Sequence, residues 1–508
     1  MKVKLLLHTV EHLKPTQIVF QIKNRLIKPT YKDYISNQSK EVTVIPFINK
    51  YTCLNGDKLT FLNLSDTFSS WNDTTKGMLW AYNLNYMDWL LQKNFQKQES
   101  VKWIDRFIDD LPYNKVGLDP YPTALRGINW VKFFTLYPEE KTQRRENSLY
   151  SQYKLLEKKI EYHLLGNHLL EDAYSLFIGG WYFADEKMLN KAKKLLRKEL
   201  QRQVLKDGSH YEQSPMYHCI LLDRLLDCYN FAVSDTSFSD KSFLAFLKEK
   251  AEAMLGHIQT IIYSDGSIPL LNDSALGIAP TPKQIFEYAK NLKLSYGKIP
   301  LKECGYRQFY NNTMEAIVDV GNITATYQPG HTHADTFNYE LRIDGNEFIV
   351  DSGISTYNKD SRRQWERSTV AHNTVSVDNK SSSEVWGGFR VGKRAKVRII
   401  EEKDRYIRVK HNGFGVACER SFRCTTRAFE VTDAIKKRAV SYIHLAPNVK
   451  IVSCNDSEII TSVAKISVRN ATKIEIEDTR VAKEYNRLQH NKTIKIYFDR
   501  VLEYTIHS

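Results

Sequence analysis

The sequence predicts an α+β protein of more than one domain, in which a helical half precedes a half built of antiparallel strands. The chain has 508 residues, which is too long for one ordinary core. Hydrophobic residues recur with a helical period from about residue 76 to 295, and from about residue 300 they alternate as they do in strands. Helices in series followed by strands in series indicate separate domains.

The helical half is expected to span residues 76–300, after an N-terminal extension, residues 1–75, that packs on it. In the extension a helix is predicted after Pro15, followed by loops and short strands. Gly and Pro punctuate the helical half, which predicts stacked helical hairpins. One of its apolar stripes, with lysines on the opposite face, comprises Leu189, Ala192, Leu196 and Leu200.

The strand half is expected to span residues 301–508. The stretch FNYELRIDGNEFIVDSG alternates apolar and polar residues and contains Asp344-Gly345, a dipeptide that favours a two-residue hairpin turn. Similar patterning continues in AHNTVSVDN, RAKVRIIEEKDRYIRVKHNG, RSFRCTTRAFEVTDAI and TKIEIEDT. We therefore expect one antiparallel domain, with the boundary near residues 295–310.

Lys and Arg exceed Asp and Glu by 73 − 59 = 14, which suits either an anionic partner or a solvated basic surface with no such partner. There is no basic stripe with interleaved aromatics and no finger or Walker-type motif, which argues against nucleic acid. No apolar stretch is long enough for a transmembrane segment. The seven cysteines have no framework spacing, and the N-terminal MKVKLLLHTVEHLKP is a poor signal peptide. The cytoplasm is favoured, with a periplasmic or exported location as the alternative.

Two stretches of the helical half carry polar groups suited to a cleft. In GNHLLEDAYSLFIGGWYF, Asn167 either caps a helix or turns its amide into the cleft as a donor. In DGSHYEQSPMYHCILLDRLLD, Pro215 marks a helix start, where the dipole would favour the phenolate of Tyr217 and lower its pKa. The alternative for Tyr217 is ordinary amphipathic packing.

Histidines and a carboxylate of the strand half are spaced for a metal site. His331 and His333 lie two residues apart and would share one face of a strand. Asp351 would return beside them after the Asp344-Gly345 turn, and His372 lies in a later strand-like stretch. Two imidazoles and a carboxylate suit zinc, although histidines on strands more often serve the core or the surface.

Taken together, several motifs resemble the heparinase II/III superfamily of polysaccharide lyases, over about residues 75–450. The motifs are NHLLED, DGSHYEQSPMYH, HADTFNYEL, VDSGISTY, RSTVAHNTVSVD, SEVWGGFRV and YPTALRGINWVKFF. Within that superfamily the sequence resembles members found in bacterial exopolysaccharide and capsule gene clusters. The resemblance implies an incomplete (α/α) toroid followed by an antiparallel β-sandwich, and cleavage of a uronic-acid-containing polysaccharide by β-elimination.

The resemblance also implies the site. Asn167 would meet the uronate carboxylate, Tyr217 would act as acid and base, and His331 would assist. His333, Asp351 and His372 would hold a structural zinc or another divalent ion. Tyr211 competes with Tyr217 for the catalytic role, and Asn85 stands where related sequences often have His. The residues expected to bind substrate are Arg126, His168, Tyr211, Glu212 and Trp386, with Trp80 and Trp130 as further sugar platforms.

Elimination requires a base for the C5 proton, a donor that stabilises the charge developing on the carboxylate, and an acid for the leaving oxygen. Two alternatives remain open at this point. One is a non-catalytic protein that binds acidic glycans or serves exopolysaccharide assembly or modification on the same scaffold. The other is a hydrolase that uses a carboxylate pair such as Glu212 and Asp223. The sequence leaves open which polysaccharide is the substrate, whether cleavage is endo or exo, and the oligomeric state.

Overall fold

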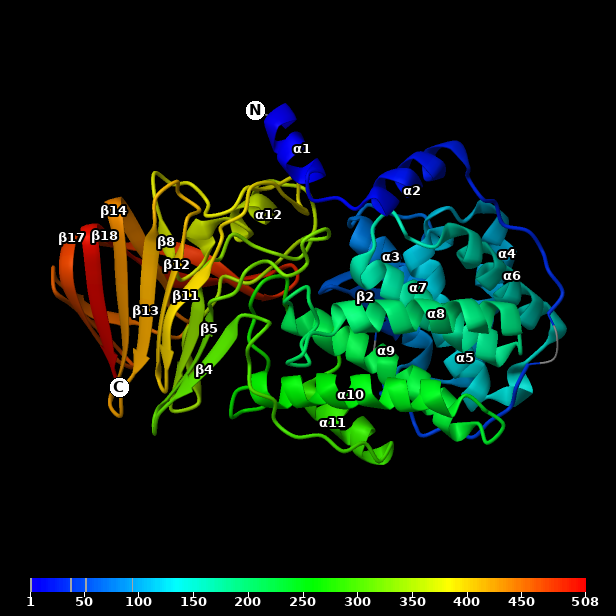
Figure 1. Ribbon diagram of the computed structural model, residues 1–508. Coiled ribbons are helices and arrows are strands. Elements are labelled where there is room, and N and C mark those ends of the chain that lie inside the picture. Colours follow the sequence, from blue (N-terminus) through cyan, green and yellow to red (C-terminus); the bar gives the residue numbers. More distant parts are fainter. Residues whose placement is uncertain (1, 37–38, 51–52, 94) are drawn as a thin grey trace.

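The computed structural model describes residues 2–36, 39–50, 53–93 and 95–508, and its helical half and strand half lie side by side (Figure 1). The order predicted from hydrophobic period, helices first and strands second, is confirmed. The last helix before the strands, α11 (Pro282–Asn291), is followed by the first strand of the second half, β4 (Tyr306–Tyr310).

The N-terminal extension contributes two helices and a small antiparallel sheet. The helices are α1 (Lys2–Val10) and α2 (Pro15–Leu26), and α2 begins at the proline that predicted it. The sheet consists of β1 (Leu54–Asn55), β2 (Lys58–Phe61) and β3 (Leu64–Thr67). In Figure 1, α1 and α2 lie along the same edge of the molecule, α1 beside the strand half and α2 on the helical half.

The helical half is an incomplete toroid of packed helices around an apolar core. Within this core, α7 contacts α5, α8 and α9, and the predicted stripe of α8 is buried at Ala192, Leu196 and Leu200. The helices are α3 (Met78–Tyr86), α4 (Lys97–Asp110), α5 (Pro120–Leu136), α6 (Gln143–Lys159), α7 (Gly166–Tyr182), α8 (Glu186–Gln203), α9 (Pro215–Ser234), α10 (Lys241–Ile261) and α11. No described helix combines the length and the hydropathy needed to cross a bilayer.

The strand half is a β-sandwich of one large and one small antiparallel sheet that share a hydrophobic core. The small sheet has the order β4-β5-β6-β7, with β5 (Met314–Asp319), β6 (Tyr339–Ile343) and β7 (Asn346–Ile349). The path of the large sheet is β11-β12-β13-β14-β18-β17-β16-β15, and β8 (Val375–Ser376) pairs with β14. Its strands are β11 (Arg398–Lys403), β12 (Tyr406–His411), β13 (Cys418–Cys424), β14 (Ala428–His444), β15 (Ile451–Cys454), β16 (Glu458–Thr461), β17 (Lys465–Glu484) and β18 (Arg487–His507).

Loops and short elements of the strand half face the toroid. They include α12 (Ser361–Glu366) and the two-stranded ribbon of β9 (Val385–Trp386) and β10 (Arg390–Val391). The predicted hairpin joins β6 to β7, and its turn residues Asp344 and Gly345 have φ angles of 49° and 74°, as a type I′ turn requires. The expectation that His331 and His333 lie on a strand is wrong, because both precede β6 in a loop.

Candidate active site

A cavity of about 610 Å³ lies between the toroid and the loops of the sandwich. Both halves supply its walls, which makes it the natural place to look for a site that uses residues from both. Toroid helices α3, α5, α7 and α9 line one side, and segments 328–331, 356–359 and 485–486 line the other. Asn167, Tyr217 and His331 all line this cavity.

Asn167 lies in the first turn of α7, where its amide has two partners. Its Nδ2 is 2.8 Å from Oε2 of Glu212 and 3.0 Å from Nε2 of His331, and its backbone N–H donates to Oε1 of Glu212 over 2.8 Å. The expected alternative, an N-cap role for Asn167, is wrong, because the N-cap residue is Leu165 and no side chain caps this helix. A buried carboxylate thus fixes which way the amide faces.

The orientation of His331 is set from the other side by Asp273. His331 Nδ1 is 2.9 Å from Oδ2 of Asp273, and Arg363 donates to both oxygens of the same carboxylate over 2.5 and 2.7 Å. Although burial raises the pKa of Asp273, the charge of Arg363 and the histidines hold it well below its usual range. An ionised carboxylate only accepts, so the proton sits on Nδ1 and Nε2 offers a lone pair toward Asn167.

Tyr217 stacks on the imidazole of His331 with ring centroids 3.8 Å apart. It lies in the first turn of α9, where Ser214 Oγ accepts from its backbone N–H. Its hydroxyl is 3.2 Å from that of Tyr357, which is in turn 3.3 Å from Nδ1 of His331. The predicted lowering of the pKa of Tyr217 is wrong: burial raises it, against the opposing effects of the Tyr357 hydrogen bond and Arg363.

Of the residues expected to bind substrate, His168 lines the cavity, and its Nδ1 is 2.9 Å from Oε2 of Glu161. Tyr211 and Glu212 lie behind the wall. Tyr211 packs on Tyr327 with its hydroxyl unpartnered, so Tyr217 is the tyrosine of this motif that faces the cavity. The carboxylate of Glu212 contacts the site through Asn167 and His331.

Arg126 and Trp386 lie elsewhere, so their expected contacts with substrate are corrected. Arg126 is fully buried in the toroid and donates to Gln152 and to the carbonyls of Asn85 and Gly117. Trp386 sits on the β9–β10 ribbon and donates to Thr9 Oγ1 over 3.1 Å. Of the two tryptophans expected as further sugar platforms, Trp80 lines the cavity and Trp130 belongs to the toroid core.

The three residues expected to hold zinc lie close together behind His331. His372 Nδ1 is 2.7 Å from Oδ2 of Asp351, and the rings of His372 and His333 are 5.2 Å apart. His333 Nε2 is 2.7 Å from Oδ1 of Asp273, which leaves its Nδ1 unpartnered, as is Nε2 of His372. Burial lowers the pKa of His333 to about 4, so its imidazole is neutral near pH 7. These residues lie on loops rather than on the strands that were expected.

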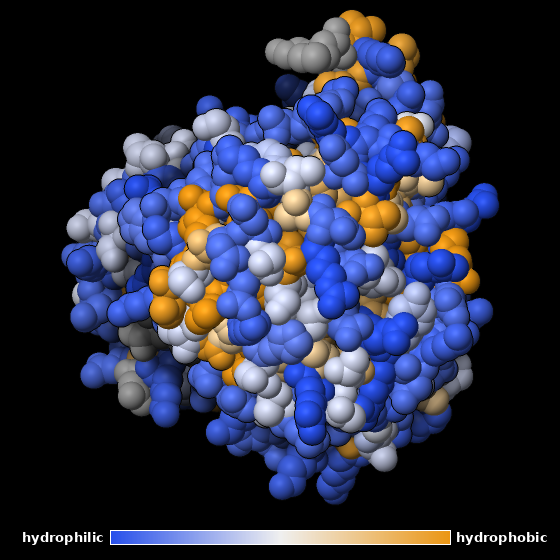
Figure 2. All heavy atoms as spheres, turned by 90° about the vertical axis from the view of Figure 1, so that its left-hand side faces the viewer, coloured by the Kyte–Doolittle hydropathy of each residue, from blue (hydrophilic) through white to orange (hydrophobic). Residues whose placement is uncertain are grey.

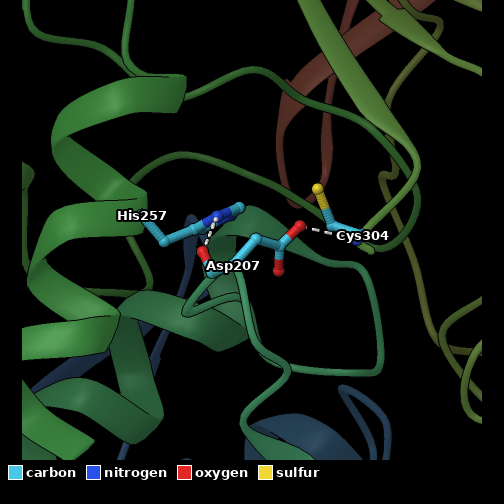
Figure 3. Close-up of side chains that lie close together, drawn as sticks. All are labelled: Asp207, His257 and Cys304. Carbon is cyan, nitrogen blue, oxygen red and sulfur yellow. Dashed lines mark hydrogen bonds between the residues drawn. The ribbon is translucent and has the colours of Figure 1, made fainter. Parts of the chain in front are cut away.

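Another group of potential ligands, Asp207, His257 and Cys304, lies close together (Figure 3), and none of the three lines the cavity. In the described part of the chain it is the one trio whose ligand atoms all lie within 4.8 Å of each other. The Asp207 carboxylate is already engaged, because it accepts from Ser209 and from the backbone N–H groups of Lys302 and Cys304. His257 Nδ1 contacts the Asp207 carbonyl. These contacts tie α10 to the segment that leads into the sandwich.

Three residues of the site were missed by the sequence analysis: Asp273, Tyr357 and Arg363. Asp273 and Tyr357 contact His331 from 58 and 26 residues away, and Arg363 acts on it through Asp273, which is 90 residues from Arg363. Tyr357 stands in the quoted motif VDSGISTY, which was the one available signal. No pattern marks Asp273 or Arg363, because each is defined by what it contacts.

Charged groups of both signs line the cavity. Lys76 and Lys359 lie near the sandwich loops, and Arg224 lies deeper among carboxylates, 3.0 Å from Oδ2 of Asp223. The cavity walls thus carry cations, and the polar group formed by Asn167, Tyr217 and His331 lies at the junction of the two halves. Such an arrangement can bind a carboxylated sugar, hold an imidazole beside it and supply a phenolic proton.

Two family models match the chain in succession. The model described as heparinase II/III N-terminus matches residues 143–293, and the model described as heparinase II/III-like, C-terminal, matches residues 295–505. The two matches meet where the helices give way to the strands.

Among curated proteins, the chain is 26% identical over 246 residues to a heparin-sulfate lyase of Pedobacter heparinus, covering 42% of this chain and 36% of that protein. It is 23% identical over 293 residues to a heparin-sulfate lyase of Bacteroides thetaiotaomicron, covering 48% of this chain and 42% of that protein. The matches thus span less than half the length of these relatives. A crystal structure of a mutant heparan sulfate lyase from Pedobacter heparinus has the same fold, with a TM-score of 0.58, 18% identity, and coverage of 89% of this chain and 81% of that one.

Proposed function

Because the chain belongs to the heparinase II/III superfamily, we propose that it is a polysaccharide lyase that cleaves a uronic-acid-containing polysaccharide by β-elimination. The observation that carries this proposal is that Asn167 and Tyr217 of the toroid contact His331 of the sandwich loops at one point of the cavity. The names of the relatives point to glycosaminoglycan-like substrates, and a capsular or other exopolysaccharide of the same chemistry belongs to the same class.

In this proposal, Asn167 binds the uronate carboxylate. Its Nδ2 already faces the lone pair of His331, so a carboxylate oxygen entering beside His331 can take over that hydrogen bond. A donor aimed at the charge that develops when C5 loses its proton stabilises the transition state by about 3–4 kcal/mol. Glu212 keeps the amide turned in this direction.

His331 then takes the C5 proton, because its Nε2 has a lone pair and lies beside the bound carboxylate. The imidazolium that forms is stabilised by the ionised Asp273 at Nδ1. Tyr217 gives its phenolic proton to the leaving glycosidic oxygen, a role that suits a tyrosine whose pKa is raised by burial. When the product leaves, Nε2 of His331 releases the C5 proton to water, and Tyr217 takes up a proton from water through the hydroxyl of Tyr357, 3.2 Å away.

We further propose that His333, Asp351 and His372 bind zinc. The fit rests on two unpartnered buried ring nitrogens, on a carboxylate, and on the hydrogen bond of His333 to Asp273, which is the outer contact that orients a metal-binding histidine. Zinc bound there would cross-link the loops that carry His331 to those that precede β8, which is a structural role.

The test is to incubate the protein with a panel of uronic-acid polysaccharides and to measure formation of the C4–C5 double bond by its ultraviolet absorbance. Tyr217→Phe is expected to lower turnover by about 10²–10⁴-fold, since it removes the proton donor. Tyr211→Phe is the matched control, because that hydroxyl lies outside the cavity and has no partner. Equal turnover in both variants would contradict the assignment, and saturable binding of a polysaccharide without product would favour the non-catalytic alternative.

Exchange of the C5 hydrogen with deuterated water separates the two proton-transfer roles. Tyr217→Phe should still exchange C5–H without cleavage, because His331 remains to remove the proton. His331→Ala should abolish exchange and cleavage together. Loss of C5–H exchange in Tyr217→Phe would show that Tyr217, rather than His331, removes the C5 proton.

A further inference from the structure

The two N-terminal helices, α1 and α2, are amphipathic, but their apolar faces point to solvent and their more polar faces pack on the protein. In α1, Val3, Leu6, Leu7 and Val10 follow the i, i+3, i+4, i+7 spacing of one helix face and are 72%, 47%, 60% and 42% exposed. Figure 2 shows hydrophobic atoms exposed at the top of the molecule, where α1 stands in Figure 1.

The opposite, more polar face of α1 holds the helix to the sandwich. His8 Nδ1 lies 2.8 Å from Oε2 of Glu384, and Trp386 donates to Thr9 Oγ1 over 3.1 Å. The orientation of α1 is therefore fixed by directional contacts. These contacts turn the apolar stripe away from the body of the protein.

The same arrangement is repeated in α2. Gln17 is buried and donates to the carbonyls of Leu164 and Tyr327, so the polar side of the helix is again the attached one. The outward stripe comprises Ile18, Val19, Ile22 and Leu26, which are 40%, 59%, 53% and 79% exposed. Large aliphatic side chains exposed in ordered stripes, rather than singly, indicate a surface that another phase or molecule covers.

The charge around the stripes identifies the kind of partner. From residue 3 to residue 28 the chain has five Lys or Arg residues and one acidic residue, Glu11. By helical spacing, Lys23 and Arg25 lie on opposite flanks of the α2 stripe, and both are exposed. Aliphatic stripes flanked by cations on protruding helices match the interface of an anionic bilayer.

We propose that α1 and α2 form a membrane-binding surface, with the stripe residues inserted among lipid acyl chains and the flanking cations on anionic headgroups. Both helices lie along one edge of the molecule, so one flat surface can contact both (Figure 1). The protein would lie on the membrane rather than span it. This inference rests on the surface alone and is independent of the proposed catalytic function.

Co-sedimentation of the full chain with lipid vesicles tests the proposal. We expect binding to phosphatidylcholine vesicles that contain phosphatidylglycerol, weaker binding to phosphatidylcholine alone, and weakening by salt. The triple variant Leu7→Ser, Val19→Ser, Ile22→Ser should lower the partition coefficient by about tenfold or more. The matched control is Leu136→Ser, Val233→Ser, whose side chains are 43% and 42% exposed on the toroid and should leave binding unchanged.

The charge variant Lys23→Gln, Arg25→Gln should reduce binding to the anionic vesicles and leave binding to phosphatidylcholine alone unaffected. Absence of vesicle binding, or equal loss in the control and triple variants, would overturn the proposal. So would a dimer, seen by sedimentation equilibrium, that the triple variant converts to monomer, because the stripes would then be an interface between two copies of this chain.

Discussion

Replacement of Glu212 by Gln tests whether a buried carboxylate aims the amide of Asn167. Glu212 accepts two hydrogen bonds of 2.8 Å from Asn167, one from the backbone N–H and one from Nδ2. Gln offers one acceptor oxygen, so either one donor loses its partner or the amide of Asn167 turns over. A turned amide would set its oxygen against the lone pair of His331, where both groups accept.

The expected loss has two parts of different size. One charge-assisted hydrogen bond in a buried site contributes about 1.5–3 kcal/mol to the free energy of unfolding. The misdirected amide removes a donor aimed at the uronate carboxylate, which should lower kcat by about 10²–10³-fold. The change in turnover is therefore expected to exceed what a small loss of stability could cause, because the protein stays folded.

The assay pairs the ultraviolet measurement of turnover with urea unfolding of Glu212→Gln. Glu199→Gln is the matched control: Glu199 is also buried, and its carboxylate contacts Gln203 and Arg202 rather than Asn167. Unchanged turnover in Glu212→Gln, or an equal fall in Glu199→Gln, would refute the idea that Glu212 acts through Asn167.

Three further predictions concern stability and metal. Purified protein should contain about one zinc per chain by atomic emission, and His372→Ala should lose it while His163→Ala keeps it; retention in both would exclude His372 as a ligand. Although burial raises the pKa of Asp207, its hydrogen bonds to backbone amides and Ser209 hold it at about 2. A carboxyl group whose pKa is lowered by folding stabilises the folded state at pH values above its pKa in the unfolded chain, and this stabilisation is lost as the pH falls. Asp207→Asn should therefore lower the free energy of unfolding by about 2 kcal/mol at pH 7. The difference in urea midpoint between this variant and the original protein should shrink between about pH 4 and pH 2. Gly353→Ala should lower the free energy of unfolding by about 3 kcal/mol, because φ is 65° and a Cβ would collide with the carbonyl of Ala482. Gly266→Ala, which has open space around it, should lose only the energy of straining an alanine into a positive φ. Equal unfolding midpoints of the two variants would argue against the collision.

The elements were predictable because local pattern decides them. The stripe of α8 and the Asp344-Gly345 turn each depend on neighbours within a few residues, and both formed as expected. The loop that carries His331 and His333 was mistaken for strand because spacing of two residues also occurs in irregular segments. What fixes that loop is a carboxylate 58 residues earlier, which no local pattern marks.

The candidate site was predictable only in part, for a related reason. Motif resemblance pointed to Asn167, Tyr217 and His331, and the structure brings the three side chains into contact in one cavity. The protonation of Tyr217 was misjudged because the helix dipole can be inferred from sequence, whereas burial depends on the opposite half of the protein. Arg126 was misplaced for the same reason: its guanidinium is used inside the toroid.

A single carboxylate connects the two parts of this site. Asp273 accepts from His331 through one oxygen and from His333 through the other, and Arg363 donates a hydrogen bond to each of these oxygens. Any displacement of His333 must therefore turn the carboxylate and move the proton that sets the tautomer of His331. Metal bound at His333 would affect catalysis through this geometry without touching substrate. Its removal should then lower kcat more than it raises KM, since Asn167 would still bind the uronate.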